Sequence, residues 1–348
     1  MVEPSVPVLI RNRDAELIFH MINNFMKSLN KLFFLCLLGM LLTIAPKAAM
    51  AITISPVLFD YTLDPGASTQ DAIRVTNDSD QRQTYYLSVQ NFVAVGEEGK
   101  QEYLPEEDIS GLVSWMNLDQ KSLTLDARQS GDFNWMIKLP DDAEPGGHYA
   151  SVFFSTTPDT ENNTAVGVGA KTGVLFLVNV NGDIKESADV ESFKVLSRHG
   201  FLNRLPVDFE IRVKNQGNVH LKPSGNIAIN NLFGNKVASI PVNPNDSRVL
   251  PNSIRKVYST WGPKETEGPK GFFQELAAEW KGFGIGKYKA NAEILYGNRG
   301  EKMNSTVSFW VFPWRLAVVA LTLLLLLIVL FKGYNKLIVK SALGKVQK

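Results

Sequence analysis

The sequence predicts an all-β protein: two tandem immunoglobulin-like β-sandwich domains followed by one C-terminal transmembrane helix. Apolar and polar residues alternate through segments such as 133–139, 209–213 and 288–296, which is the pattern of half-buried strands. Turn signals rich in Asn, Asp, Gly and Pro recur about every 8–12 residues, and this spacing favours antiparallel sandwiches over alternating strands and helices. An uncharged apolar run, Leu316–Phe331, predicts the helix.

Residues 1–51 are predicted to be a secretory signal. The apolar run Leu32–Ile44 follows two lysines and precedes the small residues Ala49 and Ala51. A positive region, an apolar region and a small-residue exit are the three parts of a cleaved signal peptide, with cleavage here after Ala51. Because the segment before the apolar run is unusually long, Met26 is an alternative start of translation to Met1.

The composition is that of an exported globular body. The single cysteine, Cys36, lies in the predicted signal, so the mature chain would rely on burial and backbone pairing for its stability. Residues 52–314 hold 25 basic and 32 acidic side chains, a net charge of −7. An acidic body does not attract a polyanion, so we expect no nucleic-acid partner. At 45% hydrophobic residues, the chain is too apolar for a disordered protein.

The predicted strands fall into two sets that meet near Gly182–Ile184. The first domain, 52–183, and the second, 184–309, each supply about seven strands, the number that an immunoglobulin-like sandwich needs. The strands of the first domain are expected at 52–59, 72–75, 85–92, 122–125, 133–139, 149–154 and 174–180. Those of the second are expected at 190–196, 209–213, 226–229, 237–242, 254–260, 288–296 and 306–311.

An insert at 262–286 interrupts the second domain. Its first part is charged and rich in Pro and Gly. Phe272, Phe273, Leu276, Ala277 and Trp280 then follow at spacings that fit one face of a helix. One interpretation is an amphipathic turn that contacts a partner or the bilayer, with Phe272, Phe273 and Trp280 as candidate contacts. The other is a short helix that caps the open end of the sandwich.

The transmembrane helix is predicted at 310–331. The uncharged run has sixteen residues, about 24 Å of helix, so it must extend upstream to cross a hydrocarbon layer of about 30 Å. Extension places Trp310 and Trp314 in an aromatic belt and Arg315 at the interface. Lys332 begins a basic tail, 332–348, without acidic residues. The positive-inside rule then predicts a single-pass membrane protein with a cytoplasmic tail and an extracytoplasmic body.

The sequence offers little for catalysis or for a cofactor. Three histidines lie outside the predicted signal, His148, His199 and His220, and none is spaced as a zinc pair. The acidic turn at 77–80 lacks the glycine and the closing glutamate of a calcium loop. Nucleophile elbows, phosphate loops and dinucleotide fingerprints do not occur. We therefore predict no catalytic residue, no metal and no cofactor.

Several short motifs resemble the WxL-interacting surface proteins of Gram-positive bacteria. In the first domain they are the start Ile52–Pro56, the turn Pro65–Gly66, the strand Ile73–Asn77 and the segment Pro145–Ala150. In the second domain the resemblance lies in Leu250–Ser253 and in the ending, an aromatic strand followed by one membrane helix and a lysine tail. The resemblance implies a membrane-anchored, non-catalytic adaptor that contacts the cell wall and other surface proteins.

These observations favour a membrane-anchored extracytoplasmic binding or scaffold protein that contacts cell-wall glycan or a surface protein. A membrane-tethered hydrolase of wall glycan is an alternative, and it would need two carboxylates about 5–10 Å apart in a cleft. A pilus-chaperone-like assembly factor is a third possibility, because such chaperones are also twin sandwiches. A sandwich fold does not by itself choose among these functions.

Overall fold

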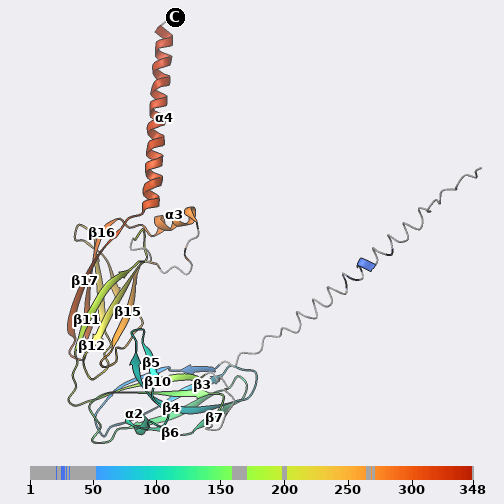
Figure 1. The fold of residues 1–348 in the computed structure, drawn as a ribbon, viewed down its shortest axis with the longest axis vertical. Coiled ribbons are helices and arrows are strands. Elements are labelled where there is room, and N and C mark those ends of the chain that lie inside the picture. Colours follow the sequence, from blue (N-terminus) through green and yellow to red (C-terminus); the bar gives the residue numbers. More distant parts are fainter. Residues whose placement is uncertain are drawn as a thin grey trace, which may run out of the picture.

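A computed structural model describes residues 21, 25–27, 29, 31, 52–158, 171–197, 202–263, 268 and 271–346. The predicted cleavage site at Ala49 and Ala51, Cys36 and His199 lie outside the described residues. The described chain is mostly β, with four sheets and one long apolar helix at its C-terminal end (Figure 1). The predicted all-β class is confirmed at this level.

The strands up to residue 180 form two sheets, which we call the N-terminal sheet pair. The first sheet has the order β1 (Ile52–Ser55), β3 (Ser68–Asn77), β8 (Ser130–Lys138), β6 (Met116–Leu118). The second has the order β2 (Leu58–Leu63), β10 (Lys171–Val180), β9 (Gly146–Ser155), β4 (Gln83–Val95), β5 (Lys100–Tyr103), with β7 (Ser122–Leu125) also on β4. A short helix, α2 (Gly111–Trp115), precedes β6.

The alternating residues of these strands build one hydrophobic core. Phe133 and Trp135 of β8 point inward, where their rings meet Phe154 of β9 and Phe176 of β10 at 5.9 and 4.9 Å between centroids. All four side chains are buried. Period-two alternation in a strand sends every second side chain to the same face, so the sequence pattern alone selects these residues for the core.

The predicted strand 52–59 is divided in two. β1 pairs antiparallel with β3 in one sheet, and β2 pairs parallel with β10 in the other. Pro56, which lies between them, has no N–H for a ladder, so it suits the crossing from one sheet to the next.

The strands from residue 188 onward form a second pair of sheets, the C-terminal sheet pair, with its own core. One sheet has the order β11 (Ala188–Leu196), β12 (Val207–Asn215), β15 (Ile254–Trp261). The other has the order β14 (Lys236–Pro241), β13 (Ser224–Asn230), β16 (Gly286–Tyr296), β17 (Glu301–Val311). Phe209, Ile211, Ile227 and Ile229 are the largest fully buried side chains here.

Two helices lie at the C-terminal end. The insert forms α3 (Phe272–Lys281), as its apolar spacing suggested, and α4 runs from Trp314 to Val346. The helix differs from the predicted span 310–331 at both ends. Trp310 belongs to β17, which stays paired with β16 as far as Val311, and Pro313 accepts the first helical bond, from Ala317. Downstream, nothing breaks the helix, so part of the predicted tail is helical.

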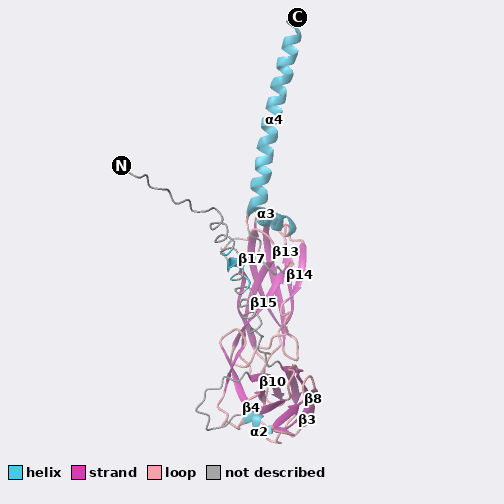
Figure 2. Cartoon of the chain, turned by 90° about the vertical axis from the view of Figure 1, so that its right-hand side faces the viewer, coloured by secondary structure: helices cyan, strands magenta, loops and turns pink. Residues whose placement is uncertain are grey.

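The two sheet pairs form an L (Figure 1). The C-terminal pair continues the axis of α4, and the N-terminal pair lies across its far end. α3 lies across the foot of α4 in both views (Figures 1 and 2). Residues 181–187, where the sequence places the domain boundary, join the two pairs.

Candidate binding site at the junction of the sheet pairs

Contacts of Asp60 with His220 and Arg248 tie β2 to two loops of the C-terminal sheet pair. Asp60 accepts a hydrogen bond from Arg248 Nε at 2.9 Å, and its other oxygen lies 2.8 Å from His220 Nε2. Burial raises the pKa of Asp60, but the hydrogen bonds and charges of His220 and Arg248 outweigh burial and hold this pKa below its ordinary value of 3.8. The ionised carboxylate is therefore the form that the junction favours.

The hairpin of β4 and β5 makes a second attachment. Figure 1 shows β5 reaching the lower ends of β12 and β15. At the hairpin turn, Glu97 accepts two hydrogen bonds from the Arg212 guanidinium, and Glu98 accepts one from Lys256 Nζ at 2.9 Å. The Lys256 backbone N–H donates to the Glu97 carbonyl at 2.8 Å. Bidentate Arg–carboxylate pairs fix orientation as well as distance, so this turn sets the angle of the L.

Gly99 allows the closest approach in this attachment. Its φ is +75°, and a Cβ at this position would lie 2.3 Å from the Arg255 guanidinium carbon. Glycine meets both demands because it tolerates left-handed backbone and has no side chain to collide.

A pocket opens where β4 separates from β9. The two strands pair as far as Asn91↔Ala150, and from Phe92 onward β4 pairs with β5 instead. The resulting fork is closed from below by Asn218 and by residues 250–252 of the C-terminal sheet pair. The cavity has a volume of about 390 Å³, within the range of ligand sites, and it exists only because both sheet pairs contribute walls.

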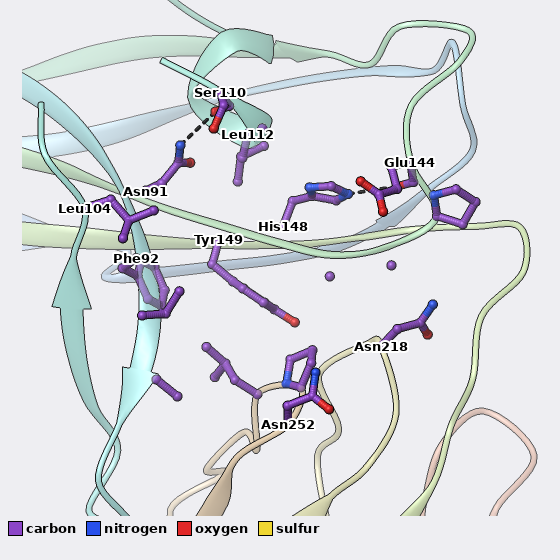
Figure 3. Close-up of a pocket in the computed structure, with 18 residues that line it drawn as sticks. Asn91, Phe92, Leu104, Ser110, Leu112, Glu144, His148, Tyr149, Asn218 and Asn252 are labelled. Carbon is purple, nitrogen blue, oxygen red and sulfur yellow. Dashed lines mark hydrogen bonds between the residues drawn. The ribbon is translucent and has the colours of Figure 1, made fainter. Parts of the chain in front are cut away.

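Apolar and polar side chains both line this pocket (Figure 3). Phe92 and Leu104 form one side, and Tyr149 points toward Asn252 across the space. The Tyr149 hydroxyl is buried without a hydrogen-bond partner among the described residues, and burial raises the pKa of Tyr149. An unpaired buried hydroxyl is costly unless a ligand or a water completes it.

The remaining polar side chains of the pocket differ in how they are held. The Asn91 amide is fixed by the Ser110 carbonyl at 2.7 Å, and the His148 ring by the Glu144 carbonyl at 2.8 Å. His148 also packs on Trp115, with 4.5 Å between ring centroids. In the described part of the chain, the Asn252 amide makes no hydrogen bond and Asn252 is exposed, so this amide is available to a ligand.

A small basic hollow of about 20 Å³ continues the pocket along β4 and the hairpin turn, lined by Lys100, Arg248 and Arg255. Burial, and after it the charge of Arg248, lowers the pKa of Arg255 below its ordinary value. Neither Lys100 nor Arg255 forms an ion pair within the described residues. The hollow is thus basic, with room for about one water molecule.

The catalytic alternative finds no support in this lining. Glu144 is the only acidic residue among the described residues that line the pocket. A glycosidase site needs two carboxylates. The described residues contain no group of three or more His, Cys, Asp or Glu side chains that could hold a metal ion.

The site residues predicted from the sequence lie elsewhere. Phe272, Phe273 and Trp280 are exposed on α3, beside the start of α4. Trp314 and Arg315 open α4, with the Arg315 guanidinium 4.6 Å from the Trp314 ring, and Lys332 lies farther along the same helix. Trp310 is exposed on β17.

Sequence reasoning missed the junction. The spacing of His220 shows only that it is not half of a zinc pair, and no motif singles out Asp60 or Arg248. Asp60 lies at a strand position, and Arg248 follows it by 188 residues. No local spacing connects such residues. A weak signal lies in Asp60 itself, since it directly follows the predicted strand 52–59 and is the one charged residue of β2.

No family model and no curated protein matches the chain. Among solved structures it is similar to the Class 5 fimbriae chaperone CfaA, at 12% identity and a TM-score of 0.34, over 76% of this chain and 100% of that chain. It is also similar to the E. coli chaperone DraB, at 9% identity and a TM-score of 0.32, over 75% and 98% of the two chains. A third is the CsuC–CsuE chaperone–tip adhesion subunit complex of Acinetobacter baumannii, at 11% identity and a TM-score of 0.33, over 74% and 97%. Likeness at this level carries no argument about function.

Proposed function

We propose that this chain is a membrane-anchored, non-catalytic binding protein whose body lies outside the membrane. The observation that supports the anchor is α4: its segment Trp314–Ile338 is the one helix in the described residues long and apolar enough to span a membrane. At 25 residues it measures about 38 Å, more than the hydrocarbon layer requires. The lysines after Phe331 favour a cytoplasmic C-terminus.

We further propose that the partner is another surface protein, of which an extended segment carrying an acidic group occupies the junction pocket. The fork carries this proposal. Beyond Asn91↔Ala150, β9 has no partner strand on its β4 side within the described residues, although its Gly147 N–H already donates to the Asn218 carbonyl at 2.7 Å. The rest of this short edge, beside the pocket, can accept a polypeptide by strand addition. The basic hollow at Lys100 and Arg255 supplies the complementary charge.

We prefer a protein partner to cell-wall glycan. A protein partner also agrees with the adaptor role that the resemblance to WxL-interacting proteins implies. The pocket walls are aliphatic and aromatic at Phe92, Val93 and Leu104, and polar side chains lie between them. The apolar walls suit apolar side chains of a peptide.

The experiment is site-specific photo-crosslinking in intact cells. A benzophenone amino acid replaces Val93 or Asn252, which line the pocket, and in the control it replaces Gln70, which is exposed in the opposite sheet. The proposal expects the same discrete protein adduct from both pocket positions and none from Gln70. It also expects Lys100→Glu to lower the adduct yield. Equal adducts at Gln70, or none at the pocket positions, would overturn it; adducts that wall-glycan digestion removes would replace the protein with glycan.

A further inference from the structure

The polarity of α3 is reversed relative to a helix on a water-exposed surface. Its acidic residues face inward: Glu279 is fully buried, and Glu275 is half-buried. Its aromatic residues face outward: the exposed fractions of Phe273 and Trp280 are 82% and 73%. A soluble surface helix normally points its apolar stripe at the core and its charges at solvent. The outer face of α3 is therefore built for an apolar surrounding.

Ion pairs hold the inner face of α3 on the root of α4. Glu279 accepts a hydrogen bond from Arg315 at 3.0 Å and another from the backbone N–H of Leu316, also at 3.0 Å. Leu316 is the third residue of α4, so its N–H has no partner inside that helix. The carboxylate of Glu279 caps α4 from outside and meets the positive end of its dipole. α3 thus has a fixed place beside the residue where α4 begins.

The loop after α3 exposes further apolar side chains at the same level. Phe283 and Ile285 are both exposed, and they immediately precede Gly286, which pairs with Val311 at the end of β17. The hairpin loop of β13 and β14 lies at this end too, since Asn230 pairs with Lys289, and it presents an exposed Phe233. Apolar exposure therefore surrounds the root of α4 instead of being confined to one helix.

We propose that α3 lies in the interface of the bilayer that α4 crosses, with Phe273 and Trp280 inserted between lipid headgroups and acyl chains. Continuity selects this occupant over a protein: the exposed face adjoins the first turn of α4, and any membrane around α4 meets it. Interfacial helices bury their apolar face about 5–10 Å into the headgroup boundary, and Trp is enriched at that depth. The inference rests on the membrane anchoring proposed above.

Nitroxide labels on the full-length chain test the proposal. The single cysteine is removed by Cys36→Ser, and single cysteines are then introduced by Phe273→Cys, Trp280→Cys, Leu325→Cys and Ile109→Cys. Leu325 reports insertion of α4. Ile109 is a matched control, since it is an apolar residue 71% exposed on the N-terminal sheet pair. The labelled protein is reconstituted in phosphatidylcholine–phosphatidylglycerol vesicles, and collision rates with oxygen and with a water-soluble nickel chelate are compared.

Labels at positions 273 and 280 should show an oxygen-to-nickel collision ratio severalfold above that at position 109 and below that at 325. Ratios at 273 and 280 equal to that at 109, with a high ratio at 325, would overturn the inference and leave the anchor intact. A low ratio at 325 would remove the anchor itself, and the inference with it. If Glu279→Gln lowers the oxygen-to-nickel ratio at positions 273 and 280 but not at 325, the capping contact of Glu279 with α4 also holds α3 in place.

Discussion

Replacing Asp60 with asparagine tests whether charge holds the junction. The change keeps the side-chain shape but removes the negative charge that His220 and Arg248 share. The exposed fractions of the Asp60 and Arg248 side chains are 29% and 19%, and His220 is almost fully buried. The pairs therefore stand between surface pairs, worth about 0–1 kcal/mol, and fully buried ones, whose breakage costs about 3–5 kcal/mol. We expect Asp60→Asn to lower the free energy of unfolding by about 2–3 kcal/mol.

The assay is denaturant unfolding of the full-length chain in detergent micelles, followed by tryptophan fluorescence. Asp132→Asn is the matched control, because Asp132 also pairs with an arginine, Arg74, but both side chains are largely exposed. The control should lose little or nothing. The pKa of Asp60 is below 3.8 in the folded protein, so its stabilisation is present above that pH and is lost as the pH falls through the folded value. The difference between wild type and Asp60→Asn should shrink in the same range. A loss no larger than that of Asp132→Asn at pH 7, or a difference that persists in acid, would refute the reasoning.

Three further predictions concern single contacts. Gly96→Ala should carry only the cost of a left-handed backbone, about 1 kcal/mol, since a Cβ at position 96 meets no atom within 4 Å. Gly99→Ala should lower the free energy of unfolding by more, because the Arg255 guanidinium would have to shift and give up its hydrogen bond to the Arg248 carbonyl. Equal losses would mean that Arg255 moves aside without cost. Glu279→Gln should speed amide exchange of Leu316 and its neighbours in α4 without changing exchange in β9, as mass spectrometry of deuterated peptides would show; uniform change would contradict the capping role. Tyr149→Phe should leave the free energy of unfolding unchanged or raise it by up to about 1 kcal/mol, because the hydroxyl is buried and unpaired. It should also weaken crosslinking at Val93. A clear loss of stability would mean that the hydroxyl has a partner.

The sequence located nearly all of the long strands because each carries its own alternation. Residues 133–139 and 288–296 needed no knowledge of their neighbours. The short strands β5 and β6 and the short helix α2 were missed, because three to five residues hold too little periodicity to stand out from a loop. The start of α4 was placed four residues early, since hydropathy does not register that Trp310 and Val311 remain paired in a sheet.

The junction pocket could not be predicted by the same reasoning. It depends on β4 leaving β9 after Asn91 and on loops of the other sheet pair closing the gap, and neither event has a local signature. Phe273 and Trp280 were recognised as unusual because their spacing is local. That Glu279 lies inside and the aromatic residues outside follows from the position of Arg315, which only the folded chain places beside α3.

Only Phe312 and Pro313 separate the last strand from α4, and that strand is zipped to β16 over its whole length. Because this connection is short and the strand is fully paired, a change in the tilt of α4 would also tilt the sheets. β16 has eleven residues, about 36 Å of strand, and the pocket lies at its distant end. If α4 crosses a bilayer, the pocket would be held at a fixed distance from it. A partner would have to present its binding segment at that distance, which favours partners attached to the same membrane.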